Sequence, residues 1–187
     1  MQRMKIFAKL FKYGLFLALA GTLVAAVAIG AAYYYLAPSL PDIENLRDVR
    51  FQVPLKVVSH EGELIAEFGE QRRNPLAYEE IPKQMTQAFL AAEDDRFFEH
   101  PGVDYRGLLR AGIQLALTGE KKQGGSTITM QVARNFYLTR QKTYTRKLSE
   151  IFLALRIEDD LSKPEILALY LNKIYLGHRA YGVGAAA

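Results

Sequence analysis

The 187-residue sequence contains no cysteine and only three histidines. Without cysteine there are no disulfide bonds and no thiolate metal sites, and the redox state of the compartment cannot be read from the composition. The histidines do not match the spacing of a zinc site; they are His60, His100 and His178. Half of the residues are hydrophobic and a quarter are charged, a balance typical of a globular domain with a hydrophobic core.

Positive charge is concentrated in two regions of the chain, whose net charge is +4. Residues 1–12 carry four cations and no anion. Residues 119–147 carry seven cations against Glu120, a net charge of +6, so the remainder of the chain is net negative. Two separate basic regions indicate two electrostatic roles. The cations of the second region are Lys121, Lys122, Arg134, Arg140, Lys142, Arg146 and Lys147.

The first basic region precedes a long uncharged segment. No charged residue lies between residues 13 and 41, and a helix needs about 20 apolar residues to cross a bilayer. We therefore predict a cytoplasmic basic tail (1–12) and a single transmembrane helix (13–37), oriented by the preceding cations. The alternative is a cleaved signal peptide ending near Ala28. The apolar run exceeds the ~7–15 residues of a signal peptide, which favours a retained anchor.

Residues 38–81 predict a linker followed by a β-hairpin. Pro38 and Pro41 follow the apolar segment and cannot continue its helix. Two short runs of β-prone residues, 55–59 and 64–68, flank a loop that contains Gly62. This pattern is typical of a hairpin.

Residues 82–187 show helical periodicity throughout, which predicts a mostly α domain. Helices are expected at 85–92 and at 103–117. Three more are expected further on: one after a cap at Ser126 or Thr127, one from Thr143 and one from Ser162. At Ser162 the sequence Ser-Lys-Pro-Glu has the spacing of a capping box. Gly119–Gly125 is expected to be a mobile loop, and the small residues after Gly182 to begin another helix of a domain incomplete at its C-terminus. The core-facing residues expected in the helix from Thr143 are Leu148, Ile151, Phe152 and Leu155.

Two polar clusters near the middle of the chain can carry chemistry. Glu93-Asp94-Asp95 ends an apolar helix, and crowding of like charges together with burial raises a carboxyl pKa, which suits a general acid or base. The loop 124–127 (Gly-Gly-Ser-Thr) offers N–H groups and hydroxyls to an anion at a helix N-terminus. The alternatives are a solvated helix end and an ordinary flexible loop.

The third cluster places Arg146 and Lys147 on one helical face with Glu150. By itself it could be a surface salt bridge of little energetic value. The surrounding net charge of +6 favours a phosphate ligand. Nucleic acid is not expected as a partner, because Asp94 and Asp95 would repel a long polyanion. A lipid-linked phosphate agrees with both the basic region and the membrane anchor.

Four ordered motifs resemble those of the peptidoglycan glycosyltransferase (transglycosylase) domains of class A penicillin-binding proteins. They lie at residues 93–100 (EDDRFFEH), 125–131 (GSTITMQ), 146–150 (RKLSE) and 166–177 (ILALYLNKIYLG). The second motif departs from the usual pair of glutamines, because Met130 replaces the first. The sequence also stops before the family's fifth motif and has no Ser-x-x-Lys, so the penicillin-binding transpeptidase domain is not expected in it.

The resemblance implies a mostly α, lysozyme-like glycosyltransferase lobe, with a small β-hairpin and the transmembrane helix, that polymerises lipid II into glycan strands for the cell wall. Glu93 would be the general base. Glu150 would be the second catalytic carboxylate, which orients cations or holds a divalent ion (Mg or Mn) on the diphosphate. The residues implied to bind substrate are Asp94, His100, Ser126, Thr127, Gln131, Arg134, Arg146 and Lys147.

The implied partners are lipid II, the growing glycan strand, the membrane and other cell-wall synthesis proteins. The implied location is the bacterial inner membrane, with the catalytic domain (82–187) outside the cytoplasm. Two alternatives stay open. A lysozyme-like fold could hydrolyse glycan, although a hydrolase needs neither the cations nor the anchor. A truncated chain could also bind lipid II without turnover, as an inactive scaffold.

Overall fold

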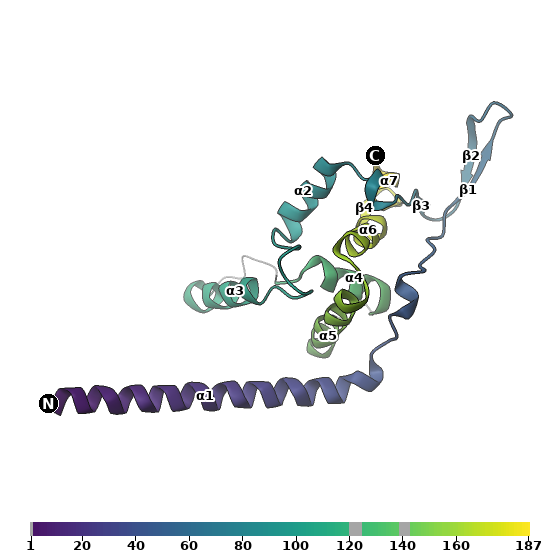
Figure 1. The fold of residues 1–187 in the computed structure, drawn as a ribbon. Helices are drawn as coiled ribbons and strands as arrows, with labels where there is room; N and C mark the ends of the chain where they lie inside the picture. The colour runs from purple at the N-terminus through teal and green to yellow at the C-terminus, as the bar shows by residue number, and fades with distance from the viewer. Residues whose placement is uncertain (1, 120–124, 139–142) are drawn as a thin grey trace. The chain divides into compact units, whose positions relative to one another are not determined.

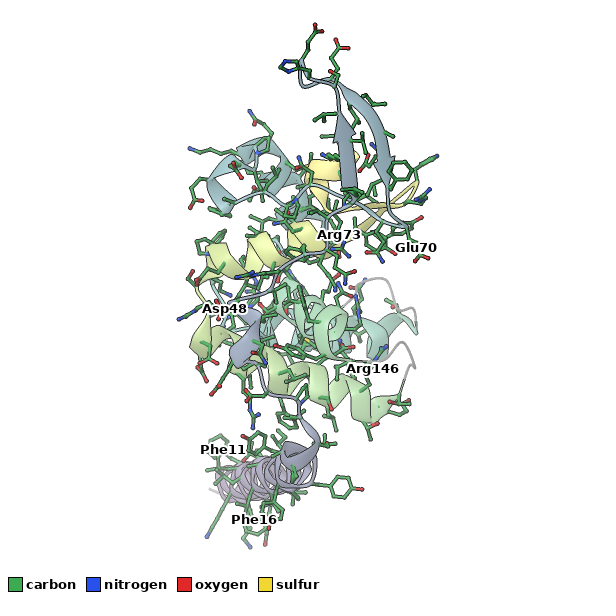
Figure 2. The ribbon with its side chains drawn as sticks, turned by 90° about the vertical axis from the view of Figure 1, so that its right-hand side faces the viewer. Phe11, Phe16, Asp48, Glu70, Arg73 and Arg146 are labelled. Atoms are coloured by element: carbon green, nitrogen blue, oxygen red, sulfur yellow. The ribbon has the colours of Figure 1, made fainter. Side chains whose placement is uncertain are left out.

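The computed structural model describes residues 2–119, 125–138 and 143–187, and the chain forms two units, residues 1–40 and 41–187 (Figure 1). The first unit contains helix α1 (Gln2–Leu36) and a short 3-10 turn (Ala37–Ser39). The segment Phe11–Ser39 has a mean hydropathy of 2.3 and is long enough to cross a membrane. Its apolar side chains project outward from the helix (Figure 2). The predicted apolar helix is confirmed. The helix begins at Gln2, so it also includes the basic tail.

The second unit begins with a 3-10 turn (Glu44–Leu46) and the predicted hairpin. Strand β1 (Leu55–Val58) pairs antiparallel with β2 (Leu64–Phe68), and Leu55 lies opposite Phe68. Most of the hairpin side chains are exposed. A further 3-10 turn (Tyr78–Glu80) leads into the helices.

The helices of the second unit confirm the predicted mostly α domain. They are α2 (Lys83–Glu93), α3 (Tyr105–Thr118), α4 (Ile128–Tyr137), α5 (Tyr144–Asp160), α6 (Lys163–Lys173) and α7 (Val183–Ala186). Helices α4, α5 and α6 lie side by side (Figure 1) and supply most of the buried apolar side chains. The expected mobile loop 119–125 falls largely outside the described residues.

Two helices expose apolar residues that periodicity alone would place in a core. In α5, Leu148 and Leu155 are 38% and 39% exposed, so their predicted inward orientation is wrong. The reason is that α5 turns a partly polar face inward, including the buried Ser149 and Glu150. Helix α3 forms as predicted, but its apolar residues stay exposed; they include Leu108, Leu109, Ile113 and Leu117.

A small three-stranded sheet was not predicted. Strand β5 (Ala180–Tyr181) lies between β3 (Arg72–Arg73), to which it is parallel, and β4 (Tyr175–Gly177), to which it is antiparallel. The domain is mostly α as predicted, but the helical periodicity expected to run through 82–187 does not hold at 175–181, where strands form. In the turn between β4 and β5, His178 and Arg179 have positive φ angles although neither is glycine. The turn lacks the Asn-Gly or Asp-Gly pair that usually indicates a hairpin in a sequence.

Arg73 joins this sheet to α6. Its side chain is buried, donates to the carbonyl oxygen of Asn172 at 3.5 Å, and places its guanidinium carbon 4.8 Å from the Tyr181 ring centroid (Figure 2). Burial lowers the pKa of Arg73. The side chain of Asn172 in turn accepts from the N–H of Leu76 at 2.9 Å and donates to its carbonyl at 2.8 Å. These contacts fix the chain before α2 against the last turn of α6.

The capping box at the start of α6 is confirmed and gives a pH-dependent prediction. Glu165 accepts from the backbone N–H of Ser162 at 2.7 Å and from its hydroxyl at 2.6 Å, and these bonds lower the pKa of Glu165. A carboxyl whose pKa is lowered in the folded state stabilises the fold at pH values above its unfolded-state pKa. This stabilisation is lost as the pH falls through the folded-state pKa. Glu165→Gln should therefore cost about 0.5–1 kcal/mol at neutral pH.

Denaturant melts of Glu165→Gln at pH 7 and at pH 3 measure this contribution. The difference from the unsubstituted protein should shrink between pH 7 and pH 3, because acid protonates the carboxyl and removes the stabilisation that its lowered pKa represents. Glu61→Gln in the exposed hairpin turn is the control and should cost little at either pH. An equal loss for Glu165→Gln at both pH values would contradict an ionised cap.

Candidate active site

Glu93 is the last residue of α2 and keeps an exposed side chain. Its Oε2 accepts a hydrogen bond from Nε2 of Gln131 at 3.0 Å. Gln131 lies in the first turns of α4, so two of the predicted motifs meet at this carboxylate. The bond occupies Oε2, while no side chain in the described part of the chain donates a hydrogen bond to Oε1. Glu93 is thus oriented and accessible, so a substrate hydroxyl can come within hydrogen-bond reach of it, as a general base requires.

Asp94, the next residue, has the opposite environment. It is 7% exposed, and its carboxylate accepts from Nε2 of His100 at 2.9 Å and from the backbone N–H of Ile128 at 2.9 Å. His100 is also buried, at 5% exposed. The predicted substrate-binding residues Asp94 and His100 therefore hold the first motif to the start of α4. Both have partners within the protein.

The N-terminus of α4 was predicted to receive an anion from the substrate. The structure places the carboxylate of Asp94 on its first N–H, that of Ile128. The hydroxyl of Thr127 accepts from Met130 N–H at 3.2 Å and donates to the carbonyl of Gly102 at 2.5 Å. Thr127, rather than Ser126, is therefore the helix cap, and the anion at this helix N-terminus belongs to the protein itself.

The basic cluster is organised around a buried carboxylate. Glu150 is 1% exposed; its Oε2 lies 3.1 Å from Nζ of Lys147, and its Oε1 lies 3.2 Å from Nε of Arg146. Arg146 extends from the first turn of α5 (Figure 2). The Lys147 ammonium also donates to Oγ of Ser126 at 2.5 Å. Glu150 therefore orients Lys147 by a hydrogen bond and pairs with Arg146 by charge alone, and the Lys147 ammonium reaches the loop before α4.

Arg134 and Tyr170 extend the site beyond Gln131. The guanidinium of Arg134 lies 3.5 Å from Oε1 of Gln131, so the amide of Gln131 bridges Arg134 and Glu93. Tyr170 is buried, and burial together with the nearby charge of Glu93 raises its pKa to about 12. It stays protonated at neutral pH. Tyr170 lies in the fourth motif, but its periodicity predicts only a core position, so sequence reasoning gave it no role.

A cavity of about 340 Å³ lies beside these residues. Glu93 and Asp94 from the first motif and Ser126 and Thr127 from the second line its wall. His100, Gln131, Arg134, Arg146, Lys147 and Glu150 are not among the lining residues. The cavity thus joins the general-base candidate to the loop that Lys147 contacts, while the predicted cations Arg134, Arg146 and Lys147 do not line it.

Three further charged residues line this cavity, and none of them was among the residues implied to be catalytic or to bind substrate. They are Asp95, Asp104 and Arg110. Burial raises the pKa of Asp104, but the N–H of Gly107 and the guanidinium of Arg96 outweigh it, so the net pKa is lowered. Asp104 is therefore an ionised cap of α3 rather than a proton donor. The sequence pattern of α3 indicates only a helix, so it does not identify Arg110 as a residue that lines the cavity.

The described residues do not fit a bound divalent ion. No group of three or more His, Asp or Glu side chains in the described ranges is arranged to hold one. Each oxygen of Glu150, the predicted ligand, faces a cation instead. We therefore derive no step through a metal at this carboxylate.

The comparisons with known proteins agree with this arrangement of motifs. A sequence profile of the family described as Transglycosylase matches residues 61–187, so the chain belongs to the transglycosylase family. The predicted family resemblance is confirmed.

Among individual proteins, the chain is similar to penicillin-binding protein 1A from several bacteria. It is 54% identical over 179 residues to that of Escherichia coli (strain K12), which covers 96% of this chain and 21% of that protein. It is 55% identical over 168 residues to that of Pseudomonas aeruginosa, which covers 89% of this chain and 20% of that protein. The chain spans about a fifth of the length of the curated relatives it matches.

Proposed function

We propose that this chain is the membrane-anchored glycosyltransferase part of an enzyme that polymerises lipid II into peptidoglycan glycan strands. One observation carries the proposal. The exposed carboxylate of Glu93 and the hydroxyl of Ser126, which accepts from the Lys147 ammonium, line the same cavity. A base that lines the cavity and a cation bonded to a residue of its wall suit a transfer that removes a proton and releases an anionic leaving group.

In this mechanism Glu93 removes the proton from the 4-hydroxyl of the acceptor N-acetylglucosamine. The hydroxyl oxygen attacks C1 of the donor N-acetylmuramic acid, with inversion. The bond from C1 to the lipid diphosphate breaks, and its electron pair leaves with the diphosphate. Gln131 holds Glu93 through Oε2, which leaves Oε1 to accept the proton.

The leaving diphosphate accumulates negative charge, which cations can stabilise in a partly desolvated site. Lys147 is the first candidate, because its ammonium reaches Ser126 at the cavity wall. Arg134 is the second, and Arg146 the third. Glu150 contributes by orienting Lys147 and by pairing with Arg146. A divalent ion on the diphosphate itself would add charge neutralisation, but it would need ligands other than Glu150.

Helix α1 fits a membrane-anchored protein with a lipid-linked substrate. The four cations before the apolar segment place the N-terminus in the cytoplasm by the positive-inside rule. We therefore place residues 82–187 outside the cytoplasm, at the bacterial inner membrane. The partners that follow are lipid II and the growing glycan strand, together with other cell-wall synthesis proteins.

The test is incubation of the purified protein, with α1 in detergent, with fluorescent lipid II. Long glycan strands are the expected product. Two other outcomes correspond to the alternative functions and contradict the proposal. Release of glycan fragments from isolated sacculi without polymer indicates a hydrolase. Binding of lipid II without polymer indicates a scaffold.

A further inference from the structure

A buried ionic cluster lies outside the proposed site and joins three helices. Oε1 of Glu158 in α5 accepts from Oγ1 of Thr129 in α4 at 2.5 Å and from Nζ of Lys163 in α6 at 2.8 Å. The side chains of Glu158 and Lys163 are 9% and 18% exposed, and Thr129 is fully buried. None of the three lines the cavity or enters the proposed transfer.

Lys163 also contacts the turn that follows the acidic motif. Its ammonium donates to the carbonyl of His100 at 2.6 Å and lies 4.3 Å from the ring centroid of Phe97, which is 1% exposed. A carboxylate, a carbonyl and an aromatic face therefore share one ammonium. Such contacts are strong in a desolvated setting and depend on position.

The same turn lies directly against α5 at Gly102. A Cβ on Gly102 would stand 2.7 Å from the carbonyl oxygen of Ala154 and 2.9 Å from Cγ of Glu158, and its φ is +84°. Only glycine fits at this distance and in this conformation. The turn 97–102 is thus held by Lys163 on one side and by close backbone contact with α5 on the other.

The turn is connected to the reactive carboxylate in two steps. The ring of His100, whose carbonyl Lys163 holds, donates to Asp94. Asp94 directly follows Glu93 and is tied to the first N–H of α4. A shift of the His100 backbone is therefore passed to Glu93. The same turn also reaches the cavity wall, because the carbonyl of Gly102 accepts from the Thr127 hydroxyl, whereas Ser126 has its own support from Lys147.

We propose that Lys163 is a positioning residue for the transfer reaction, which acts with Glu158 and Thr129 to hold the turn 97–102 and, through His100 and Asp94, the carboxylate of Glu93. This inference rests on the proposed function for its kinetic consequence. A displacement of about 1 Å at a reacting group can cost ~100-fold in rate. Because Lys163 does not line the cavity, the loss falls on kcat and leaves KM for lipid II nearly unchanged.

Lys163→Met tests the proposal, because it removes the ammonium and keeps an unbranched side chain. The matched control is Lys173→Met at the other end of the same helix. Lys173 is also partly buried, and its ammonium lies 4.5 Å from the Phe136 ring centroid. Among the described residues, no hydrogen bond or ion pair joins Lys173 to the turn 97–102. We expect kcat to fall roughly 10- to 100-fold in Lys163→Met, with KM within about twofold, and to stay within about twofold in Lys173→Met.

Hydrogen exchange of the peptide spanning residues 94–102 gives a readout that needs no activity. Exchange there should be at least about tenfold faster in Lys163→Met than in Lys173→Met under conditions where both are folded. If Lys163→Met does not fold, Thr129→Val removes only the hydroxyl bond to Glu158 and should produce smaller changes in the same direction.

Unchanged kcat together with unchanged exchange in a folded Lys163→Met would overturn the proposal, as would a loss confined to KM. Failure of the proposed function is seen separately, as absence of polymer from the unsubstituted protein. In that case the exchange of residues 94–102 still decides whether Lys163 holds the turn.

Discussion

Glu93→Gln is expected to lower the rate of lipid II polymerisation at least ~100-fold, the lower end of what a positioned general base contributes. Glutamine keeps the size of the side chain and can still bond to Gln131, but it cannot accept the proton of the attacking hydroxyl. Because Glu93 is exposed, the substitution should leave stability within about 0.5 kcal/mol of the unsubstituted protein. The rate is measured with fluorescent lipid II, and stability by denaturant unfolding.

Glu99→Gln is the control for this substitution. Glu99 is a second exposed carboxylate of the same motif. Its backbone N–H donates to the carbonyl of Arg96 at 2.8 Å, and its side chain makes no hydrogen bond or ion pair with a described residue. Its polymerisation rate should stay within about threefold. A Glu93→Gln protein that makes polymer at a near-normal rate would show that another group removes the proton.

Glu150→Gln is expected to have the largest effect on stability. Removing one member of a buried ion pair costs ~3–5 kcal/mol, because the partner charge is left uncompensated. The partners here are less buried, with Arg146 17% and Lys147 37% exposed, so water compensates part of the loss. We expect a decrease in the free energy of unfolding of about 2–3 kcal/mol, measured by urea denaturation at neutral pH.

The double substitution Glu150→Gln with Lys147→Met separates pairing from other effects. If Glu150 acts through Lys147, the two losses should sum to more than the loss in the double variant. Strict additivity would contradict the pairing. Residual polymerisation by Glu150→Gln at a temperature where it is folded is also expected, because its carboxylate does not line the cavity.

The helices and their caps follow from local chemistry, which is why they could be predicted. Thr127, Thr143 and Ser162 each begin a helix with a side chain that satisfies a free backbone N–H or shares in a capping box. The hairpin β1–β2 could be predicted for the same reason. Such signals need no knowledge of distant parts of the chain.

The features that could not be predicted depend on contacts between residues that are far apart in the sequence. Leu148 looked like a core residue, yet α5 buries Glu150, because two cations offset the cost of taking its carboxylate out of water. The N-terminus of α4 looked open to substrate, yet Asp94, 34 residues earlier, occupies its first N–H. The two-residue strand β5 is too short to show a period of two.

The same limit applies within the site. The motifs identified Glu93 and Glu150 as a pair of carboxylates, but only their surroundings separate them. Glu93 is exposed at the cavity, and Glu150 is buried against Arg146 and Lys147. Proton removal and charge stabilisation therefore fall to different residues in our proposal.

The most direct test of this division is the dissociation constant of fluorescent lipid II, measured for Glu93→Gln and Lys147→Met. We expect Glu93→Gln to bind lipid II within about twofold of the unsubstituted protein while it polymerises lipid II at least ~100-fold more slowly. Lys147→Met should bind at least ~10-fold more weakly, because a charge-assisted hydrogen bond contributes ~1.5–3 kcal/mol. Equal weakening in both variants, or normal binding by Lys147→Met, would contradict the separation of the two roles.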